Sequence, residues 1–283
     1  LTASGNAASY AWTDGSNTPA NGSVFTPAAS SVYTVTATSA DGCTTTATTA
    51  VTVNSLPVLT TSSSPAPCNG GSGSINFSAS GNGAMAYTVN GNPQSSPYAA
   101  SAGTYTVAAT DANGCSASST VIVSEPSALS ISITKTSYNG ADLSCATATD
   151  GGFTANVSGG TLSYIYSFNG GAYSGINTFA SLAAGVYTIT VMDANNCSLS
   201  TTVSIVAPPA LQLSLSATNA LCNTGNGSLN FSTTGGTGAV TYTVNGNPQA
   251  SPFATPAGNY TVVATDANGC SVSSTAVITQ PLT

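Results

Sequence analysis

The chain has 283 residues, of which 3% are charged: one Lys or Arg, eight Asp or Glu and no His, for a formal net charge of −7. Without histidine and with a single basic residue, general acid–base catalysis at neutral pH lacks its usual groups, so no enzyme is expected. One cation cannot neutralise a phosphate backbone or an anionic membrane surface, which excludes nucleic-acid binding and a polybasic membrane patch. Hydrophobic residues make up 41% of the chain, so packed cores are expected rather than disorder.

Four copies of one pattern divide the chain, and we call them the first to fourth repeats. The first, 1–54, is a partial and more distant copy without its beginning, the second is 55–126, the third, 127–208, is a diverged copy, and the fourth is 209–283. Recurrence at a near-fixed period is the signature of a modular architecture. No long Gly/Ser linker separates the copies, so we expect a semi-rigid array.

Taken in chain order, the predicted elements are all short β-strands. Each repeat contains one strictly alternating strand, with apolar side chains facing the core and Thr facing solvent: Val32–Thr38, Thr104–Thr110, Val186–Met192 and Asn259–Thr265. The third and fourth repeats open on alternating strands at Leu129–Ile133 and Leu211–Leu215. Further strands are predicted around these pairs: Ile75/Phe77, Tyr87/Val89, Phe153/Val157, Tyr164/Tyr166, Leu229/Phe231 and Tyr242/Val244. The fold class predicted is all-β, as tandem immunoglobulin-like β-sandwich domains in a linear array.

Seven cysteines occupy two alternating positions in the repeats. The turn cysteines end the strings Asp-Gly-Cys or Asp-Ala-Asn-(Gly/Asn)-Cys, and the head cysteines stand before a Gly-rich stretch. The turn cysteines are Cys43, Cys115, Cys197 and Cys270, and the head cysteines are Cys68, Cys145 and Cys222.

The separations between head and turn cysteines of one repeat are 47, 52 and 48 residues, which predicts one disulfide per repeat in an oxidising compartment. The predicted bonds are Cys68–Cys115, Cys145–Cys197 and Cys222–Cys270, with Cys43 paired to a residue upstream of Leu1. A rival register joins Cys43–Cys68, Cys115–Cys145 and Cys197–Cys222 and leaves Cys270 unpaired. The number of strands in a repeat decides whether its head and turn cysteines can meet. With six strands the two turns lie at the same end of the sandwich, whereas with seven they lie at opposite ends and the bridge fails.

The Asp-Ala-Asn-Gly-Cys string is predicted to be a hairpin turn, in which Asp111 accepts hydrogen bonds and Asn113 and Gly114 tolerate positive φ. The string also resembles a calcium loop, but each turn offers one carboxylate where such loops have several, so no metal site is expected. Asp142 and Asp150 could form an acidic site in the third repeat, although a solvated loop is the simpler interpretation.

The recurring run Cys-Asn-Gly…Gly-Ser-(Ile/Leu)-Asn-Phe…Tyr-Thr-Val-Asn-Gly…Tyr-Thr-Val-x-Ala-Thr-Asp-Ala-Asn-Gly-Cys-Ser resembles the SprB repeat of Bacteroidota cell-surface proteins. The resemblance covers 55–281 well and 1–54 loosely, where the chain is more similar to a PKD-like or Ig-like module. One departure is Asn196, which stands where Gly is usual. The resemblance implies a large surface or secreted protein, exported by the type IX system, that acts in adhesion or gliding motility and has neither catalytic residues nor a cofactor.

These observations predict a structural segment, a stalk or fibre, of a bacterial extracellular adhesin or surface filament. Its expected partners are neighbouring repeats of the same protein and further chains in a fibre, because the strand edges lack the lysines that block edge-to-edge pairing. No signal peptide begins at Leu1 and no apolar run reaches about 18 residues, so membrane insertion is not expected in this segment.

Two alternatives remain at individual residues. Phe168 and Tyr173, in the loop Phe-Asn-Gly-Gly-Ala-Tyr, are candidate exposed contacts for a glycan or a partner surface, which would make the segment a binding module. Lys135, the only cation, could form an isopeptide bond to an Asn, but the other repeats lack this lysine. An exposed strand residue is therefore the preferred interpretation of Lys135.

Overall fold

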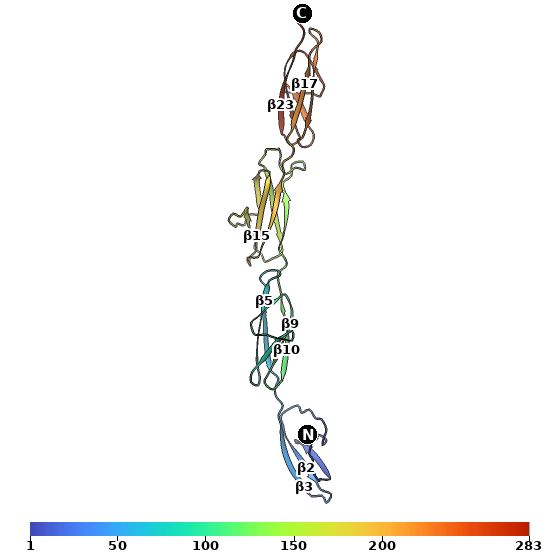
Figure 1. The fold of residues 1–283 in the computed structure, drawn as a ribbon, viewed down its shortest axis with the longest axis vertical. Coiled ribbons are helices and arrows are strands. Elements are labelled where there is room, and N and C mark those ends of the chain that lie inside the picture. The colour runs from blue at the N-terminus through green and yellow to red at the C-terminus, as the bar shows by residue number, and fades with distance from the viewer. Residues whose placement is uncertain (283) are drawn as a thin grey trace. The chain divides into compact units, whose positions relative to one another are not determined.

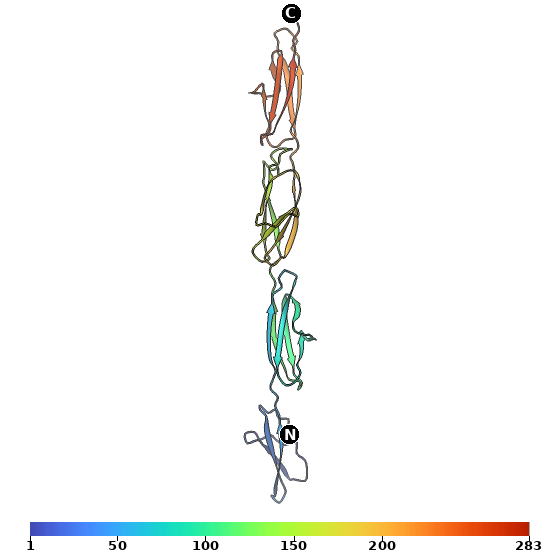
Figure 2. The ribbon, with the colours of Figure 1, turned by 90° about the vertical axis from the view of Figure 1, so that its left-hand side faces the viewer.

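The computed structural model describes residues 1–282, and every regular element among them is a β-strand. Figures 1 and 2 show each repeat as its own group of strands, blue, teal, green to yellow, and orange to red in chain order. All strand pairs in this part of the chain are antiparallel and lie inside one repeat, so no repeat exchanges a strand with another. The predicted all-β, immunoglobulin-like fold class is confirmed.

The second repeat is a sandwich of seven strands in two sheets. One sheet has the order β4-β5-β8 and the other β10-β9-β6-β7. Two facing antiparallel sheets with this crossover are the immunoglobulin-like arrangement. The bounds are β4 Val58–Ser64, β5 Ser72–Ser80, β6 Ala86–Val89, β7 Asn92–Pro93, β8 Tyr98–Ser101, β9 Gly103–Thr110 and β10 Ser116–Val123.

The third and fourth repeats have the same topology. Their sheets are β11-β12-β14 with β13-β15-β16, and β17-β18-β21 with β20-β19-β22-β23. In the third repeat an isolated bridge between Tyr166 and Ser174 stands in the place of the short edge strand. The bounds are β11 Ser130–Lys135, β12 Gly151–Ser158, β13 Ile165–Phe168, β14 Thr178–Leu182, β15 Gly185–Met192, β16 Ser198–Ile205, β17 Gln212–Thr218, β18 Gly227–Thr234, β19 Thr241–Val244, β20 Asn247–Pro248, β21 Phe253–Thr255, β22 Gly258–Thr265 and β23 Ser271–Ile278.

The first repeat has a single sheet of three strands, β1 (Ser9–Thr13), β2 (Ser31–Thr38) and β3 (Thr44–Val51). Its small core is formed by Trp12, Tyr33 and Val35. These strands are paired in the same order as β6, β9 and β10 of the second repeat.

The predicted alternation of apolar and polar residues determines which side chains form the cores of the complete repeats. On β9, Val107 and Ala109 are fully buried, whereas Thr104 and Thr106 are exposed. The four strictly alternating strands are observed within one residue of their predicted bounds, as β2, β9, β15 and β22. Period-2 burial on a strand is the strongest local signal in a sequence of this kind.

The head loop and the turn of a repeat lie at opposite ends of its sandwich. In the fourth repeat the turn that ends at Cys270 precedes β23, whereas the head loop meets the far end of β23, where Ala220 N donates to Thr279 O over 3.0 Å. A strand of eight residues is about 25 Å long, whereas disulfide-bonded Cα atoms lie about 4.4–6.8 Å apart. The predicted bonds Cys68–Cys115, Cys145–Cys197 and Cys222–Cys270 are therefore wrong, because the two cysteines of one repeat lie at opposite ends of its sandwich.

Close packing at the head loop requires a glycine at the start of the second strand. A Cβ atom on Gly227 would overlap the carbonyl oxygen of Thr218 and would lie 2.7 Å from the side chain of Ile278. Gly73 and Gly151 face the same restriction in their repeats.

The chain divides into two compact units. One comprises Leu1–Ala66 with Gly70–Glu125, and the other Pro67–Asn69 with Pro126–Thr283. The short segment Pro67–Asn69 groups with the second unit because it carries Cys68, whose disulfide partner is there.

Candidate functional site: disulfide-bonded joints between repeats

Both disulfides join the head cysteine of one repeat to the turn cysteine of the next. They are Cys68–Cys197 and Cys145–Cys270, with sequence separations of 129 and 125 residues. The Cα–Cα distance is 5.7 Å in each, within the usual range for a disulfide. The rival register is also wrong, because it contains neither bond.

Three cysteines bond to no other described residue: Cys43 and Cys222 are exposed and Cys115 is half-buried. The upstream partner expected for Cys43 stays a prediction.

An aspartate organises each turn of the second to fourth repeats. In the fourth repeat, Asp266 Oδ1 accepts hydrogen bonds from the backbone amides of Asn268 (3.0 Å) and Cys270 (2.9 Å). Asp266 Oδ2 accepts from Thr237 N over 2.8 Å. These bonds fix the hairpin so that the Asn268 and Cys270 side chains are presented together.

The equivalent hydrogen bonds in the third repeat explain why the pKa of Asp193 is shifted. Burial alone would raise the pKa of Asp193, but hydrogen bonds from the amides of Thr161, Cys197 and Asn195 outweigh it and hold the pKa below its usual value. The pKa of Asp111 is lowered in the same way, against burial, by amides that include those of Cys115 and Asn113. These carboxylates are part of the hairpin's structure.

The asparagine of the turn string has a role that the sequence analysis missed. Positive φ falls on Gly114 (82°) and on Asn196 (65°), but Asn113 is not among the residues with positive φ. Asn113 therefore does not adopt the positive φ that it was expected to tolerate, whereas Asn196 takes the conformation of the Gly that it replaces. The counterparts of Asn113 in the third and fourth repeats are Asn195 and Asn268. Each of them donates a hydrogen bond to the head loop of the preceding repeat.

At the joint between the third and fourth repeats, Asn268 Nδ2 donates to Ser144 O (3.1 Å) and to Tyr138 O (3.2 Å). The Sγ atom of Cys270 lies 3.1 Å from the same Ser144 oxygen. The other disulfide has matching contacts: Asn195 Nδ2 donates to Pro67 O over 2.9 Å, and Cys197 Sγ lies 3.4 Å from that oxygen. Each joint therefore combines one covalent bond with an amide bound to the carbonyl preceding the head cysteine. The repeated Asn was visible in the sequence, but only as a turn residue.

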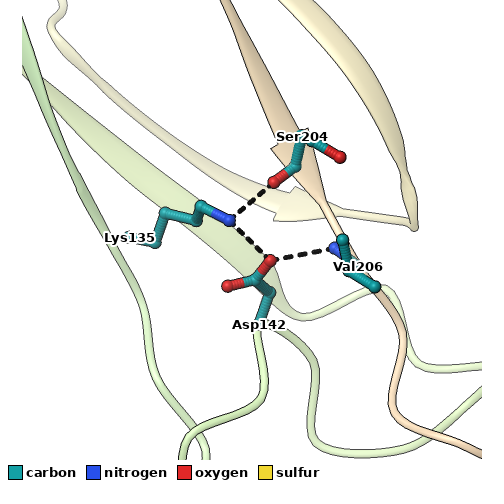
Figure 3. A network of polar contacts seen from close by, with 4 residues as sticks. All are labelled: Lys135, Asp142, Ser204 and Val206. Atoms are coloured by element: carbon teal, nitrogen blue, oxygen red, sulfur yellow. Dashed lines mark hydrogen bonds and ion pairs between the residues drawn. The ribbon is translucent and has the colours of Figure 1, made fainter.

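The head loop of the third repeat is braced by the only cation (Figure 3). Lys135 Nζ donates to Asp142 Oδ2 and to Ser204 O, both over 2.7 Å, and Val206 N donates to the same Asp142 oxygen over 2.9 Å. The loop that carries Cys145 is thereby tied to the end of β16. Burial would raise the pKa of Asp142, but the hydrogen bonds and charge of Lys135 and the amide of Val206 lower it.

The exposed position expected for Lys135 is confirmed, since its side chain is 37% exposed at the end of β11. Its Nζ atom contacts Asp142 and a carbonyl, so the geometry gives no support to an isopeptide bond with Asn. Asp150 is bound within its own loop, where Oδ1 accepts from Ser144 N over 3.1 Å. Among residues 1–282 no group of three or more His, Cys, Asp or Glu side chains is arranged to hold a metal ion.

The other two head loops use a side chain from the segment after the last strand. In the fourth repeat, Asn223 Nδ2 donates to Pro281 O and Thr224 N to Gln280 Oε1, both over 3.2 Å. In the second repeat, Gly70 N donates to Glu125 Oε2 over 2.6 Å. All three loops are thus held in place independently of the disulfide.

The two residues of the candidate ligand loop have different environments in the structure. Phe168 is half-buried in an aromatic cluster, stacked on Phe179 at a centroid distance of 4.8 Å and on Tyr187 at 5.4 Å. The expectation that Phe168 is an exposed contact was wrong. Its alternation with Tyr166 on β13 directs it to the core face. Tyr173 is 43% exposed, as expected.

No protein-family model and no curated protein sequence matches the chain. Among solved structures, the N-terminal eight Ig domains of Down syndrome cell adhesion molecule align over 98% of this chain at 14% identity, with a TM-score of 0.39. The chain spans about half of that fragment, 46%. A Ca²⁺-stabilised adhesin that helps an Antarctic bacterium bind ice aligns over 99% of this chain and 92% of its own, at 16% identity and a TM-score of 0.32.

A tetra-tandem repeat from the extending region of a large adhesion protein aligns over 95% of this chain and 90% of its own, at 17% identity and a TM-score of 0.30. In residues 1–282 there is no helix with the length and apolar character needed to span a membrane.

Proposed function

We propose that the chain is a load-bearing structural segment, a stalk or fibre, of an extracellular adhesin or surface filament. The observation that carries the proposal is that both disulfides connect successive repeats and neither closes a repeat on itself. A disulfide that only stabilised a small domain would lie within it. A bond between repeats instead acts on their relative motion.

A second covalent link removes the hinge that a single peptide linker allows. The third and fourth repeats are joined by the chain at Ala207–Pro209 and also by Cys145–Cys270. Two attachment points separated in space resist both bending and rotation, whereas one permits both. The hydrogen bonds of Asn268 add to this restraint.

Within a repeat the strands are placed to carry tension in shear. In the fourth repeat the first strand, β17, lies beside the last strand, β23, and their ends meet where Thr279 N donates to Asn219 Oδ1 over 2.9 Å. Because the two strands run in the same direction, force applied between the start of β17 and the end of β23 slides one along the other. Contacts loaded in shear must break at the same time.

The two disulfides also limit how far the chain can extend. They overlap in sequence, because Cys145 lies between Cys68 and Cys197. The shortest covalent route through the oxidised chain enters at Cys68, crosses to Cys197 and returns to Cys145 before crossing to Cys270. This route uses about half of the chain, so the greatest extension is roughly 500 Å, against roughly 1000 Å after reduction.

The finer assignment rests on the sequence resemblance. We propose an SprB-like surface protein of Bacteroidota, secreted by the type IX system and acting in adhesion or gliding motility. The two disulfides favour an oxidising, extracytoplasmic setting. The scarcity of titratable groups near neutral pH supports a role without catalysis or cofactor. Glycan recognition has less support, since Phe168 packs into the core.

Single-molecule force spectroscopy tests the mechanical role. A chain pulled from its two ends is expected to reach about half of its reduced contour length when oxidised, and the full length in the presence of a reductant. The variant with both Cys145→Ser and Cys270→Ser should extend further than the oxidised parent, because one bypass is lost. Equal contour lengths with and without reductant would contradict the proposal. The Cys222→Ser variant, which changes an unpaired cysteine, serves as the control.

A further inference from the structure

We propose that Asn268 is a deamidation site, protected while the joint between the third and fourth repeats is closed and reactive once that joint opens. The reaction converts its carboxamide to a carboxylate, so an opened joint loses the group by which it closes again. This inference goes beyond the proposed function, because it concerns a covalent modification and needs no applied force.

The residue that follows each joint asparagine decides how readily it reacts. Asn268 is followed by Gly269. Asparagine is a thermolabile residue, and it deamidates fastest before glycine, because glycine has no side chain to hinder attack by its own backbone nitrogen. In the other joint the equivalent Asn195 is followed by Asn196, whose side chain hinders this attack. The two joints therefore differ in their resistance to deamidation.

The closed joint occupies both groups that would react. The Nδ2 atom of Asn268 donates to two carbonyl oxygens of the third repeat's head loop, and its Oδ1 atom accepts from Asn139 Nδ2 over 2.5 Å. The attacking nitrogen is also engaged, since Gly269 N donates to Asp266 O over 3.1 Å. These bonds must break before the nitrogen can attack the side chain, so the closed joint protects the site.

Opening the joint removes the protection but keeps the reactive pair together. All the hydrogen-bond partners of the Asn268 carboxamide lie between residues 138 and 144, directly before Cys145 in the third repeat. Separation of the two repeats, which the Cys145–Cys270 bond resists, therefore breaks every bond to this carboxamide at once. Asn268 and Gly269 remain neighbours in the hairpin of the fourth repeat, so the reaction can then proceed.

The reaction needs water and no other reagent. The Gly269 nitrogen loses its proton and attacks Cγ of Asn268, the Cγ–Nδ2 bond breaks, and ammonia leaves, which produces a cyclic succinimide. Water then opens this ring at one of its two carbonyl carbons and gives either aspartate or isoaspartate at position 268. One water is taken up and one ammonia is released, and nothing is oxidised or reduced.

Either product weakens the joint. A carboxylate has no proton to donate to Tyr138 O or Ser144 O, and its charge is repelled by both carbonyl oxygens. Isoaspartate also adds a methylene group to the main chain two residues before Cys270, which changes the position of the cysteine in the hairpin. A joint that stays open is therefore locked open, whereas the joint at Cys68–Cys197 can close again.

The first test incubates the full chain in mildly alkaline buffer with and without a reductant, followed by peptide mass spectrometry, which identifies each deamidated asparagine by its gain in mass. We expect Asn268 to react at least several-fold faster in the reduced chain than in the oxidised chain. Cys145→Ser should react at the faster rate without reductant, whereas Cys222→Ser, the control, should behave like the parent. Gly269→Asn, which copies Asn196 of the third repeat, should suppress the reaction in both states.

The second test measures whether the opened joint can close. The reduced, incubated chain is reoxidised with a glutathione buffer, and we expect less Cys145–Cys270 than Cys68–Cys197 to be recovered. Fresh Asn268→Asp should show the same deficit after reduction and reoxidation. Equal deamidation rates in the oxidised and reduced chains, an unchanged rate in Gly269→Asn, or equal recovery of both bonds would each overturn the inference. Such a result leaves the proposed function standing, because that function depends on the disulfides and not on the chemistry of Asn268.

Discussion

Cys145 is bonded to Cys270, 125 residues further along the chain, although Cys197 lies closer in sequence and in the same repeat. The topology accounts for this choice. The head loop and the turn of one sandwich are separated by the length of its last strand, whereas the head loop of one repeat meets the turn of the next. The disulfides consequently belong to the junctions between domains.

The single basic residue offers a direct test of this pairing. Trypsin can cut only after Lys135, so digestion of the unfolded, oxidised chain yields fragments 1–135 and 136–283. We expect these fragments to migrate together on a non-reducing denaturing gel, because Cys68–Cys197 spans the cut, and to separate on reduction. Bonds within repeats would let them separate without reductant. Cys68→Ser should release the fragments, whereas Cys115→Ser should leave them joined.

Removing the amide of Asn268 should expose the neighbouring disulfide. The variant Asn268→Ala loses the bonds to Ser144 O and Tyr138 O, each worth about 0.5–1.5 kcal/mol. The joint should open more often, and a small thiol should reduce Cys145–Cys270 about 5-fold to about 100-fold faster, because the two bonds together contribute about 1–3 kcal/mol. The measurement is quenched alkylation followed by mass spectrometry. Asn113→Ala, in the unbonded hairpin, is the control, and an unchanged rate in Asn268→Ala would count against a role for this amide.

The buried turn aspartates predict how stability depends on pH. The pKa of Asp193 is lowered in the folded protein, so its contribution is fully present above its unfolded pKa of about 3.9 and is lost as the pH falls through the lower folded value. The free energy of unfolding of the third repeat, measured with denaturant, should therefore be nearly constant from pH 7 to about pH 5 and decrease below about pH 4.

The variant Asp193→Asn checks the assignment. Its amide group would face Thr161 N, a donor, and should destabilise the repeat by about 1–3 kcal/mol at pH 7. The variant should also lose part of the acid dependence. If it showed the same acid dependence as the parent, the effect would have to come from other carboxylates.

The approach of the head loop to the second strand predicts a strong effect of a single methyl group. Gly227→Ala places a Cβ atom against the backbone of Thr218 and the side chain of Ile278, so it should destabilise the fourth repeat by about 1–3 kcal/mol. Gly175→Ala is the matched control, because its Cβ atom has no neighbour within 4 Å and should change stability little. Unfolding followed by hydrogen exchange assigns the loss to the correct repeat.

The strands could be predicted from the sequence because each buries one face, and period-2 patterning then marks every second residue. The disulfide pairing could not, because it depends on the number of strands in a repeat. The deciding element is the short edge strand, β7 (Asn92–Pro93) or β20 (Asn247–Pro248). Two exposed residues carry no alternation, so the count of seven was not visible.

The joint between repeats could be predicted from the sequence only in part. The recurrence of Asp-Ala-Asn-Gly-Cys predicted a hairpin, and the structure has one. The contacts of Asn195 and Asn268 lie between repeats, and no local pattern reports which side chain crosses a domain boundary. Phe168 is a different case, since its alternation with Tyr166 was sufficient to place it in the core.

The staggered bonds also impose an order on biosynthesis. A head cysteine precedes its partner by more than 120 residues, so its native bond cannot form before the rest of its own repeat and most of the next have been synthesised. Once folded, the intervening sandwich keeps the nearer turn cysteine out of reach. Each native bond can therefore close only when both of the repeats that it joins have folded.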